Sequence, residues 1–233
     1  QKIMEIKAAD VAKLRKMTGA GMMDCKKALI EADGDYDKAQ DIIRERGKLV
    51  AAKRADRSAT EGVVVSKIVG QKGYMLCLAC ETDFVAKNSE FSATANEMLD
   101  IAIAADAADL EALNAVAADG RTVADKVTEK SGQTGEKVEL VYYAKIEAPM
   151  CVTYIHTNHK LGTLIGFNKE IGMEVAKDVA MQAAAMAPIS ISREDCDPAV
   201  IEHERSIGRE QARLDGKPEA MLDKIAEGKV NKF

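Results

Sequence analysis

Apolar residues recur at helical spacing in the first part of the chain. Val11, Leu14 and Met17 follow one another at intervals of three, which places them on one face of a first helix. Residues 18–21 then interrupt the pattern with two glycines, and closely spaced glycines favour a tight turn. This stretch therefore predicts a helix that ends in a sharp change of direction.

A second and a third helix complete a three-helix unit over residues 10–47. Asp35 is expected to cap the third helix at its N-terminus, and Gly47 is expected to end it. Residues 48–61 are polar and basic, and we interpret them as a solvated helical linker rather than a phosphate-binding patch. The second helix carries Met22, Cys25, Ala28 and Leu29 on one side, and the third is expected to bury Tyr36, Ala39, Ile42 and Ile43.

Strand patterns begin at Gly62. Residues 63–69 are a short β-branched run, and residues 70–73 predict a four-residue turn. Residues 74–80 are apolar on both faces, as expected for a central strand that is covered on both sides. Helical patterns follow over residues 91–105 and 109–130, and a strand pattern over residues 138–146.

A second hairpin is predicted over residues 151–167, with a four-residue turn at 157–160. An Ala-rich helix over residues 171–187 follows it and ends at Pro188. Each hairpin is thus strand, turn, strand and helix, which predicts two similar α+β subdomains. Phe84 follows only the first hairpin, so this connection does not require an aromatic residue for folding.

The last part of the chain, from Asp197 onward, is highly charged. Residues 216–218 interrupt its apolar positions, which predicts two antiparallel helices. The predicted fold class is therefore α+β, with helices at both ends and small antiparallel sheets between them. The apolar positions of this helical pair are Ile201, Ile207, Leu214, Met221, Leu222 and Ile225.

Composition narrows the class of protein. The chain has 233 residues, 47% of them hydrophobic, which is enough for a packed core. Its net charge of −5 disfavours a nucleic-acid-binding protein, because such proteins usually bind the phosphates through a basic face. Five irregularly spaced cysteines indicate free thiols in a reducing compartment. The sequence begins at Gln1, which suggests a trimmed start, and without a signal peptide or membrane span we expect a cytoplasmic protein.

Candidate catalytic and metal sites are weak. Cys77 and Cys80 fall in a predicted strand, where residues three apart point to opposite faces, so core packing is the favoured interpretation. His156 and His159 flank a turn without further ligands, and we interpret His156 as a hydrogen-bonding surface group. No phosphate-binding loop or dinucleotide fingerprint is present. We therefore predict no enzymatic chemistry, no cofactor and no metal.

Two motifs carry a resemblance to a known family. One is TGAGMMDCKKAL at residues 18–29, and the other is ETDFVAK at residues 81–87. Both resemble signatures of the elongation factor Ts family and lie at the spacing seen there. Further similarity at residues 179–188 and 216–233 extends the resemblance over essentially the whole chain.

The resemblance implies a domain organisation. It assigns residues 1–56 to a ubiquitin-associated-like three-helix domain with its linker, and residues 57–147 to the first core subdomain. Residues 148–190 would form the second core subdomain, and residues 191–233 a coiled-coil hairpin used for dimerisation or partner contact. In the family the chain continues with a strand that returns to the second sheet, so that sheet is expected to lack a strand here and to expose an edge.

The resemblance also implies a function. Members of the elongation factor Ts family exchange guanine nucleotide on elongation factor Tu. No direct nucleic-acid or membrane partner is expected. Thr82, Asp83, Phe84 and Val85 would push beside the magnesium site of the partner. The first helical domain would touch its nucleotide-binding domain, and the second subdomain, including His156, would grip its far end. The residues expected to contact the partner from the first domain are Gly19, Ala20, Gly21, Met22 and Met23.

The residues fit such a role. Phe84 is large and stiff, Thr82 is suited to cap a helix, and Asp83 suits a first helical turn. The alternative for Phe84 is core packing, which the resemblance and the missing aromatic in the second hairpin disfavour. For Met22 and Met23, partner contact and core packing stay equally open.

Two other classes of protein are weighed against an exchange factor. An adaptor that binds ubiquitin-like folds through residues 10–47 would explain the three helices but not the segment after Cys80. A ribosome- or RNA-associated protein would need a basic face, which the acidic composition disfavours.

Overall fold

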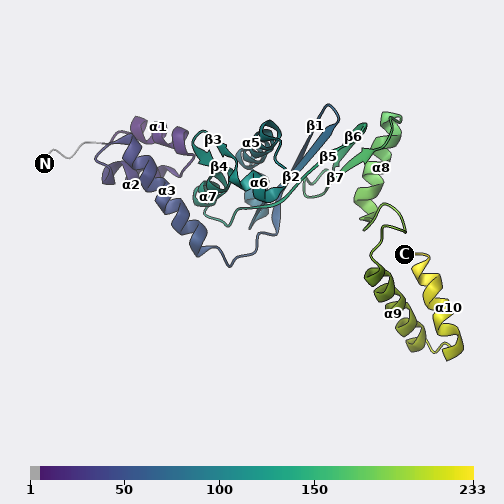
Figure 1. The fold of residues 1–233 in the computed structure, drawn as a ribbon. Helices are drawn as coiled ribbons and strands as arrows, with labels where there is room; N and C mark the ends of the chain where they lie inside the picture. The colour runs from purple at the N-terminus through teal and green to yellow at the C-terminus, as the bar shows by residue number, and fades with distance from the viewer. Residues whose placement is uncertain (1–5) are drawn as a thin grey trace. The chain divides into compact units, whose positions relative to one another are not determined.

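The computed structural model describes residues 6–233, and the chain divides into two compact units at Ala185 and Met186. Helices occur together with small antiparallel sheets, so the α+β fold class predicted from the sequence is confirmed (Figure 1). Across residues 6–233, no helix combines the length and the apolar character needed to cross a bilayer.

The first unit begins with three helices around a small core. They are α1 (Ala8–Thr18), α2 (Met22–Glu31) and α3 (Tyr36–Lys53). The predicted cap is confirmed, because the Asp35 side chain accepts hydrogen bonds from the backbone N–H groups of Asp37 and Lys38, at 3.0 and 3.1 Å. The buried residues of this core are Val11, Leu14, Ala20, Cys25, Ala28, Leu29, Ala32 and Ala39.

The expected end of the third helix is wrong. Gly47 does not end the third helix, which continues to Lys53. Instead Gly47 faces Gly132 of α7 (Val123–Thr134), where a Cβ on Gly132 would lie only 2.4 Å from the Cα of Gly47. Met17 and Met22 are exposed, although each shares a helical stripe with buried residues.

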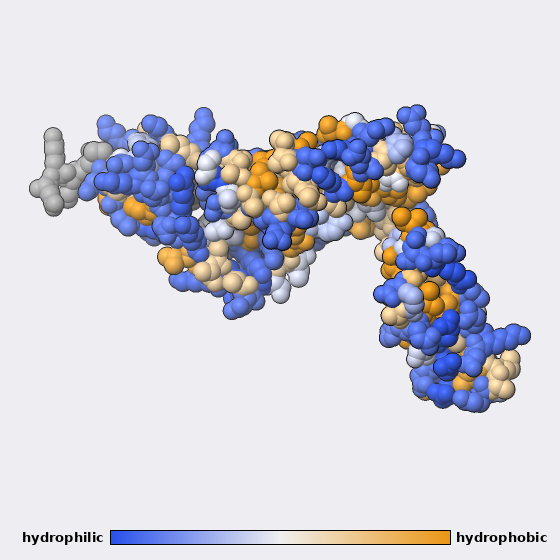
Figure 2. Space-filling model, in the orientation of Figure 1, coloured by the Kyte–Doolittle hydropathy of each residue, from blue (hydrophilic) through white to orange (hydrophobic). Residues whose placement is uncertain are grey.

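A three-stranded antiparallel sheet forms the centre of the first unit. Its order is β1 (Glu61–Val69), β2 (Lys72–Cys80), β5 (Glu139–Glu147), so the prediction of a central strand over residues 74–80 is confirmed. Helix α5 (Ser89–Ala105) packs on one face. In Figure 2, which keeps the orientation of Figure 1, apolar residues are more frequent over these strands than over the N-terminal helices.

The predicted turn length is wrong in the first hairpin and correct in the second. Val69 pairs with Lys72, so only Gly70 and Gln71 turn the first hairpin, with Gly70 in the left-handed region at φ 61°. In the second hairpin Ile155 pairs with Gly162, and the backbone N–H of His156 donates to the carbonyl oxygen of Leu161 at 2.8 Å, so residues 157–160 form the predicted four-residue turn. The second turn also bonds to β1, because the carbonyl oxygen of His159 accepts from the backbone N–H of Val64, so the two hairpins are less alike than their sequences suggest.

Short elements fill the segment between α5 and β5. The predicted helical pieces are present, but between them lies a β-ribbon that the sequence pattern does not reveal, because each strand has only two residues. The elements are α6 (Leu110–Ala115), β3 (Ala117–Ala118), β4 (Arg121–Thr122) and α7.

The second hairpin carries the next helix. It consists of β6 (Met150–Ile155) and β7 (Gly162–Phe167), paired as a two-stranded sheet, and α8 (Met173–Met186) packs on it. Ala176 and Ala180 are buried against Val152. The hydroxyl of Thr163 donates to the carbonyl oxygen of Ala180 at 2.7 Å, which fixes the helix on the sheet.

The second unit contains a pair of helices, α9 (Pro198–Leu214) and α10 (Glu219–Val230), which pack on each other. Asp197 caps α9 by accepting from the backbone N–H of Ala199 at 2.8 Å. Ion pairs join the helices at Arg209–Asp223 and Arg205–Glu227. The buried residues between them are Gly208, Ala212, Leu222, Ala226 and Val230.

Candidate functional site

Phe84 projects into solvent from a short helix, α4 (Asp83–Ala86), that follows β2. Its side chain is 85% exposed, so Phe84 is not a core residue. Ala86 is buried and Val85 packs partly against the central core. One side of α4 therefore anchors the helix, while Phe84 is displayed at the surface as an apolar group that a partner could bury.

Local hydrogen bonds define the start of α4. The hydroxyl of Thr82 accepts from the backbone N–H of Val85 at 3.5 Å, which is the expected N-cap. The Lys87 ammonium lies 2.6 Å from a carboxylate oxygen of Asp83, and this hydrogen bond holds the pKa of the Asp83 carboxyl below its ordinary value. Asp83 thus stays ionised in the first turn, where the helix dipole favours negative charge.

The Gly19–Met23 segment divides into buried and exposed residues. Gly19 has φ 68° and ends α1 in the left-handed conformation, and Gly21 caps α2. Ala20 is buried in the three-helix core, so its side chain is not presented at the surface. Met22 and Met23 are 43% and 65% exposed. Only the two methionines offer apolar side chains to a partner from this segment.

His156 lies just after β6, at the start of the connection to β7. Its Nδ1 lies 2.8 Å from the hydroxyl of Tyr154; His156 is exposed, whereas Tyr154 is partly buried. Its backbone N–H donates to the carbonyl oxygen of Leu161 at 2.8 Å, which holds the connection in a fixed shape. The imidazole is therefore available at the surface for hydrogen bonding to another molecule.

The structure brings the His156 connection close to α4. The backbone N–H of Val64 on β1 donates to the carbonyl oxygen of His159 at 2.7 Å, and Lys160 forms an ion pair with Glu61. After the hydrogen bond from Lys87, the charge of Lys160 also lowers the pKa of Asp83. Two predicted contact regions thus share one neighbourhood, although they are far apart in the sequence.

The Gly19–Met23 segment is tied to another part of the core. Gln133, near the end of α7, donates from Nε2 to the carbonyl oxygen of Thr18 at 2.6 Å. Two basic residues of the 48–61 segment are also engaged within the chain. Lys48 pairs with Glu45 at 2.8 Å, and Arg54 pairs with Glu81 at 2.9 Å, which favours the linker interpretation over a phosphate-binding patch.

The cysteines occur as free thiols. Cys80 is fully buried in β2, and burial, together with the charge of Glu136, raises the pKa of its thiol to about 11. Burial also raises the pKa of Cys77. Neither thiol has the lowered pKa of a reactive nucleophile. In the described part of the chain, no group of three or more His, Cys, Asp or Glu side chains is arranged to hold a metal ion.

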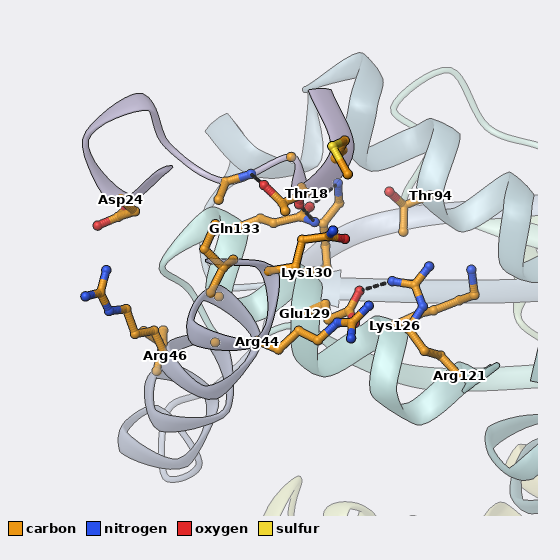
Figure 3. A pocket seen from close by; sticks show the side chains of 18 of the residues that line it. Thr18, Asp24, Arg44, Arg46, Thr94, Arg121, Lys126, Glu129, Lys130 and Gln133 are labelled. Carbon is orange, nitrogen blue, oxygen red and sulfur yellow. Dashed lines mark hydrogen bonds and ion pairs between the residues drawn. The ribbon is translucent and has the colours of Figure 1, made fainter. Parts of the chain in front are cut away.

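A cavity of about 560 Å³ lies between the N-terminal helices and helices α5 and α7 (Figure 3). Glu129 meets both Arg121 and Arg44 in its wall, at 2.6 and 3.6 Å. Lys130 is almost fully buried there and donates to Gln133 at 3.1 Å. Sequence patterns do not reveal this cavity, because its walls come from distant segments. Ion pairs within the chain occupy several of its charged groups, so we assign it no ligand.

The comparisons with known proteins agree with the two motifs. A family model described as Elongation factor TS matches residues 81–233. The chain is 47% identical to Elongation factor Ts of Cytophaga hutchinsonii, over 98% of this chain and 84% of that protein. Identity is also 47% to the proteins of the same name from Porphyromonas gingivalis, over 99% and 84%, and Christiangramia forsetii, over 98% and 84%. The resemblance seen in the sequence is thereby confirmed, and the chain belongs to the elongation factor Ts family.

Proposed function

We propose that this chain releases GDP from elongation factor Tu by pressing the Thr82–Val85 segment beside the magnesium and phosphate site of that GTPase. Membership of the elongation factor Ts family implies a role in guanine-nucleotide exchange on elongation factor Tu. The observation that supports the mechanism is Phe84, which is 85% exposed at the start of a capped and anchored helix.

Exchange of this kind needs a rigid surface group rather than an acid or a base. Magnesium joins the phosphates of GDP to the GTPase, so displacing its ligands weakens the binding of GDP. A phenylalanine side chain buries a large area and loses few rotamers when it is immobilised. The coupling is reciprocal. If the exchange protein lowers the affinity of the GTPase for GDP, then bound GDP lowers the affinity of the GTPase for the exchange protein to the same extent.

Further contacts would supply the affinity for the GTPase. In this proposal residues 1–56 form a ubiquitin-associated-like domain whose exposed Met22 and Met23 touch the nucleotide-binding domain of the partner. Residues 57–147 and 148–190 act as two core subdomains, the second reaching the partner with His156. Residues 191–233 serve as a coiled-coil hairpin for homodimerisation or for additional partner contact.

The test is release of a fluorescent GDP analogue from purified elongation factor Tu, with and without this chain. The chain should accelerate release, and Phe84→Ala should abolish most of the acceleration, because truncating a central apolar anchor costs about 2 kcal/mol or more. The unfolding midpoint should not change, because the removed ring is exposed.

Tyr142→Ala provides the matched control for this test. Tyr142 is also an exposed aromatic residue, at 53%, but it lies on β5 and outside the proposed contact. This variant should accelerate GDP release from elongation factor Tu as much as the unaltered chain does. Normal release by Phe84→Ala would refute the mechanism.

A further inference from the structure

Glu136 holds the segment that precedes α4 from a distant part of the chain. It lies between α7 and β5, and its carboxylate accepts three hydrogen bonds. One oxygen accepts from the backbone N–H groups of Glu81 and Thr82, at 3.1 and 3.0 Å. The other accepts from the hydroxyl of Thr82 at 2.6 Å. A single carboxylate thus accepts from the two backbone N–H groups and the hydroxyl group of Glu81 and Thr82.

The hydroxyl of Thr82 connects Glu136 to the helix cap. A hydroxyl has one proton to donate, and Thr82 donates it to Glu136. Its lone pairs are then directed to the backbone N–H of Val85, from which the same oxygen accepts at 3.5 Å. The carboxylate therefore determines the direction of the capping oxygen and with it the orientation of the first turn of α4.

A second carboxylate strengthens this junction in the opposite direction. Glu81 accepts from the backbone N–H of Lys137 at 2.6 Å, while Glu136 accepts from the backbone N–H of Glu81. Cys80 adds a hydrogen bond from its thiol to the carbonyl oxygen of Thr82 at 3.3 Å. Hydrogen bonds to ionised carboxylates are stronger than neutral ones, so the backbone before Phe84 is held firmly.

The apolar contacts of α4 fix its position but not its orientation, which the hydrogen bonds of Glu136 and Glu81 can fix. Ala86 and Val85 anchor the helix to the core by apolar packing, which sets where it lies. Apolar packing is non-directional, whereas hydrogen bonds to a carboxylate restrict rotation. A helix of four residues has little internal resistance to reorientation, so the direction of Phe84 depends on how its start is held.

We propose that Glu136 is a positioning residue for nucleotide exchange, whose carboxylate fixes the start of α4 and thereby directs Phe84 toward the GTPase. This inference rests on the proposed function. Glu136 would not itself touch the partner. Its removal should leave Phe84 present and exposed but poorly oriented, so that part of the binding energy is spent on ordering the ring.

The experiment measures fluorescent-GDP release from elongation factor Tu at increasing concentrations of the chain. Glu136→Ala should lower the maximal release rate about tenfold, which corresponds to the loss of one charge-assisted hydrogen bond. The half-saturating concentration should change much less, because the other proposed contacts remain. Glu136→Gln keeps one acceptor oxygen and should lie between Glu136→Ala and the unaltered chain.

Glu129→Ala is the matched control. Glu129 also bridges distant groups, Arg44 and Arg121, but it does not touch the α4 junction. The Glu129→Ala variant should accelerate GDP release from elongation factor Tu to the normal maximal rate, even if its own unfolding midpoint falls. If Glu136→Ala is too unstable to assay, Glu136→Gln decides the question, and a folded Glu136→Gln chain with a normal maximal rate overturns the proposal.

Combining substitutions separates positioning from a general structural effect. If Glu136 acts through Phe84, adding Glu136→Ala to Phe84→Ala should lower the maximal rate little further. Fully additive losses would overturn the proposal. A chain that fails to accelerate release at all refutes the proposed function. Normal release by Glu136→Ala beside impaired release by Phe84→Ala refutes this inference alone.

Discussion

Arg54 donates from one guanidinium nitrogen, Nη1, to both carboxylate oxygens of Glu81, at 3.1 and 2.9 Å. Arg54 follows directly after α3, and Glu81 directly precedes the cap of α4. The side chain of Glu81 is only 15% exposed and also accepts from the backbone N–H of Lys137. The end of the N-terminal helices is therefore joined to the segment that displays Phe84.

Glu81 should make the stability of the first unit depend on acid pH. The hydrogen bond from the backbone N–H of Lys137, followed by the charge of Arg54, lowers the pKa of Glu81. A carboxyl whose pKa is lower in the folded state stabilises that state above its unfolded pKa, about 4.3, and loses the effect as the pH falls through the folded pKa. Glu81→Gln should thus lower the unfolding midpoint near neutral pH, and the difference from the unaltered chain should shrink below about pH 4.

Thermal unfolding followed by circular dichroism at several pH values measures this difference. Glu170→Gln, at an exposed position, is the control and should behave like the unaltered chain throughout. A deficit of Glu81→Gln that stays constant down to about pH 3 would contradict the assigned role of its charge.

The crossing of α3 and α7 should tolerate alanine at one glycine but not at the other. A Cβ on Gly132 would lie 2.4 Å from the Cα of Gly47, whereas a Cβ on Gly47 would lie at an ordinary 3.6 Å from the Cα of Gly132. Gly132→Ala should therefore destabilise the chain by about 1–3 kcal/mol through overpacking. Gly47→Ala should be neutral or stabilising by up to about 1 kcal/mol, because alanine is favoured in helices.

Urea unfolding midpoints, compared at equal m-values, test this asymmetry. Gly172→Ala is the control, because a Cβ there would meet nothing within 4 Å. Equal midpoints for Gly132→Ala and Gly47→Ala would show that the two helices do not approach as closely as described.

Cys80 and Cys196 should differ sharply in their reaction with a thiol reagent. Burial raises the pKa of Cys80 to about 11 and also blocks access, whereas Cys196 is partly exposed. Because the thiolate is the reacting species, Cys196 should be alkylated first at neutral pH. Mass spectrometry of peptides after timed alkylation gives both rates. In urea the two rates should converge, and rapid labelling of Cys80 without denaturant would contradict its burial.

Met23 should contribute to partner binding without contributing to stability. It is 65% exposed near the start of α2, and Ile30 is 56% exposed near the end of the same helix. Met23→Ala should raise the concentration of chain needed for half-maximal GDP release, because apolar area would no longer be buried on binding. Ile30→Ala is the matched control and should not. Equal effects of the two substitutions would remove Met23 from the proposed contact.

Most secondary structure could be predicted because its causes are local. The apolar spacing of Val11 and Leu14 and the cap at Asp35 act over a few residues, and both have the predicted role. The apolar character of residues 74–80 correctly indicated a strand covered on both faces. The two signature motifs likewise pointed to the family that the comparisons show.

Predictions from the sequence were incomplete or wrong where the same local pattern is compatible with more than one packing arrangement. Gly47 has the character of a helix end, but its environment is set by Gly132, which a linear pattern does not place beside it. Met22 and Cys25 both suit a buried helix face, and only the packing of the three helices exposes Met22 and buries Cys25. Ala20 is part of a recognisable motif, yet it is buried.

The sequence by itself determined the family, most of the helices and strands, and the presence of a capped turn that carries Phe84. Only the tertiary structure decided that Phe84 faces solvent and that Glu136 holds the turn from 54 residues away. The physical reason is the range of the forces involved. Periodicity and capping depend on neighbours along the chain, whereas burial and hydrogen bonds between remote residues exist only after the elements have packed.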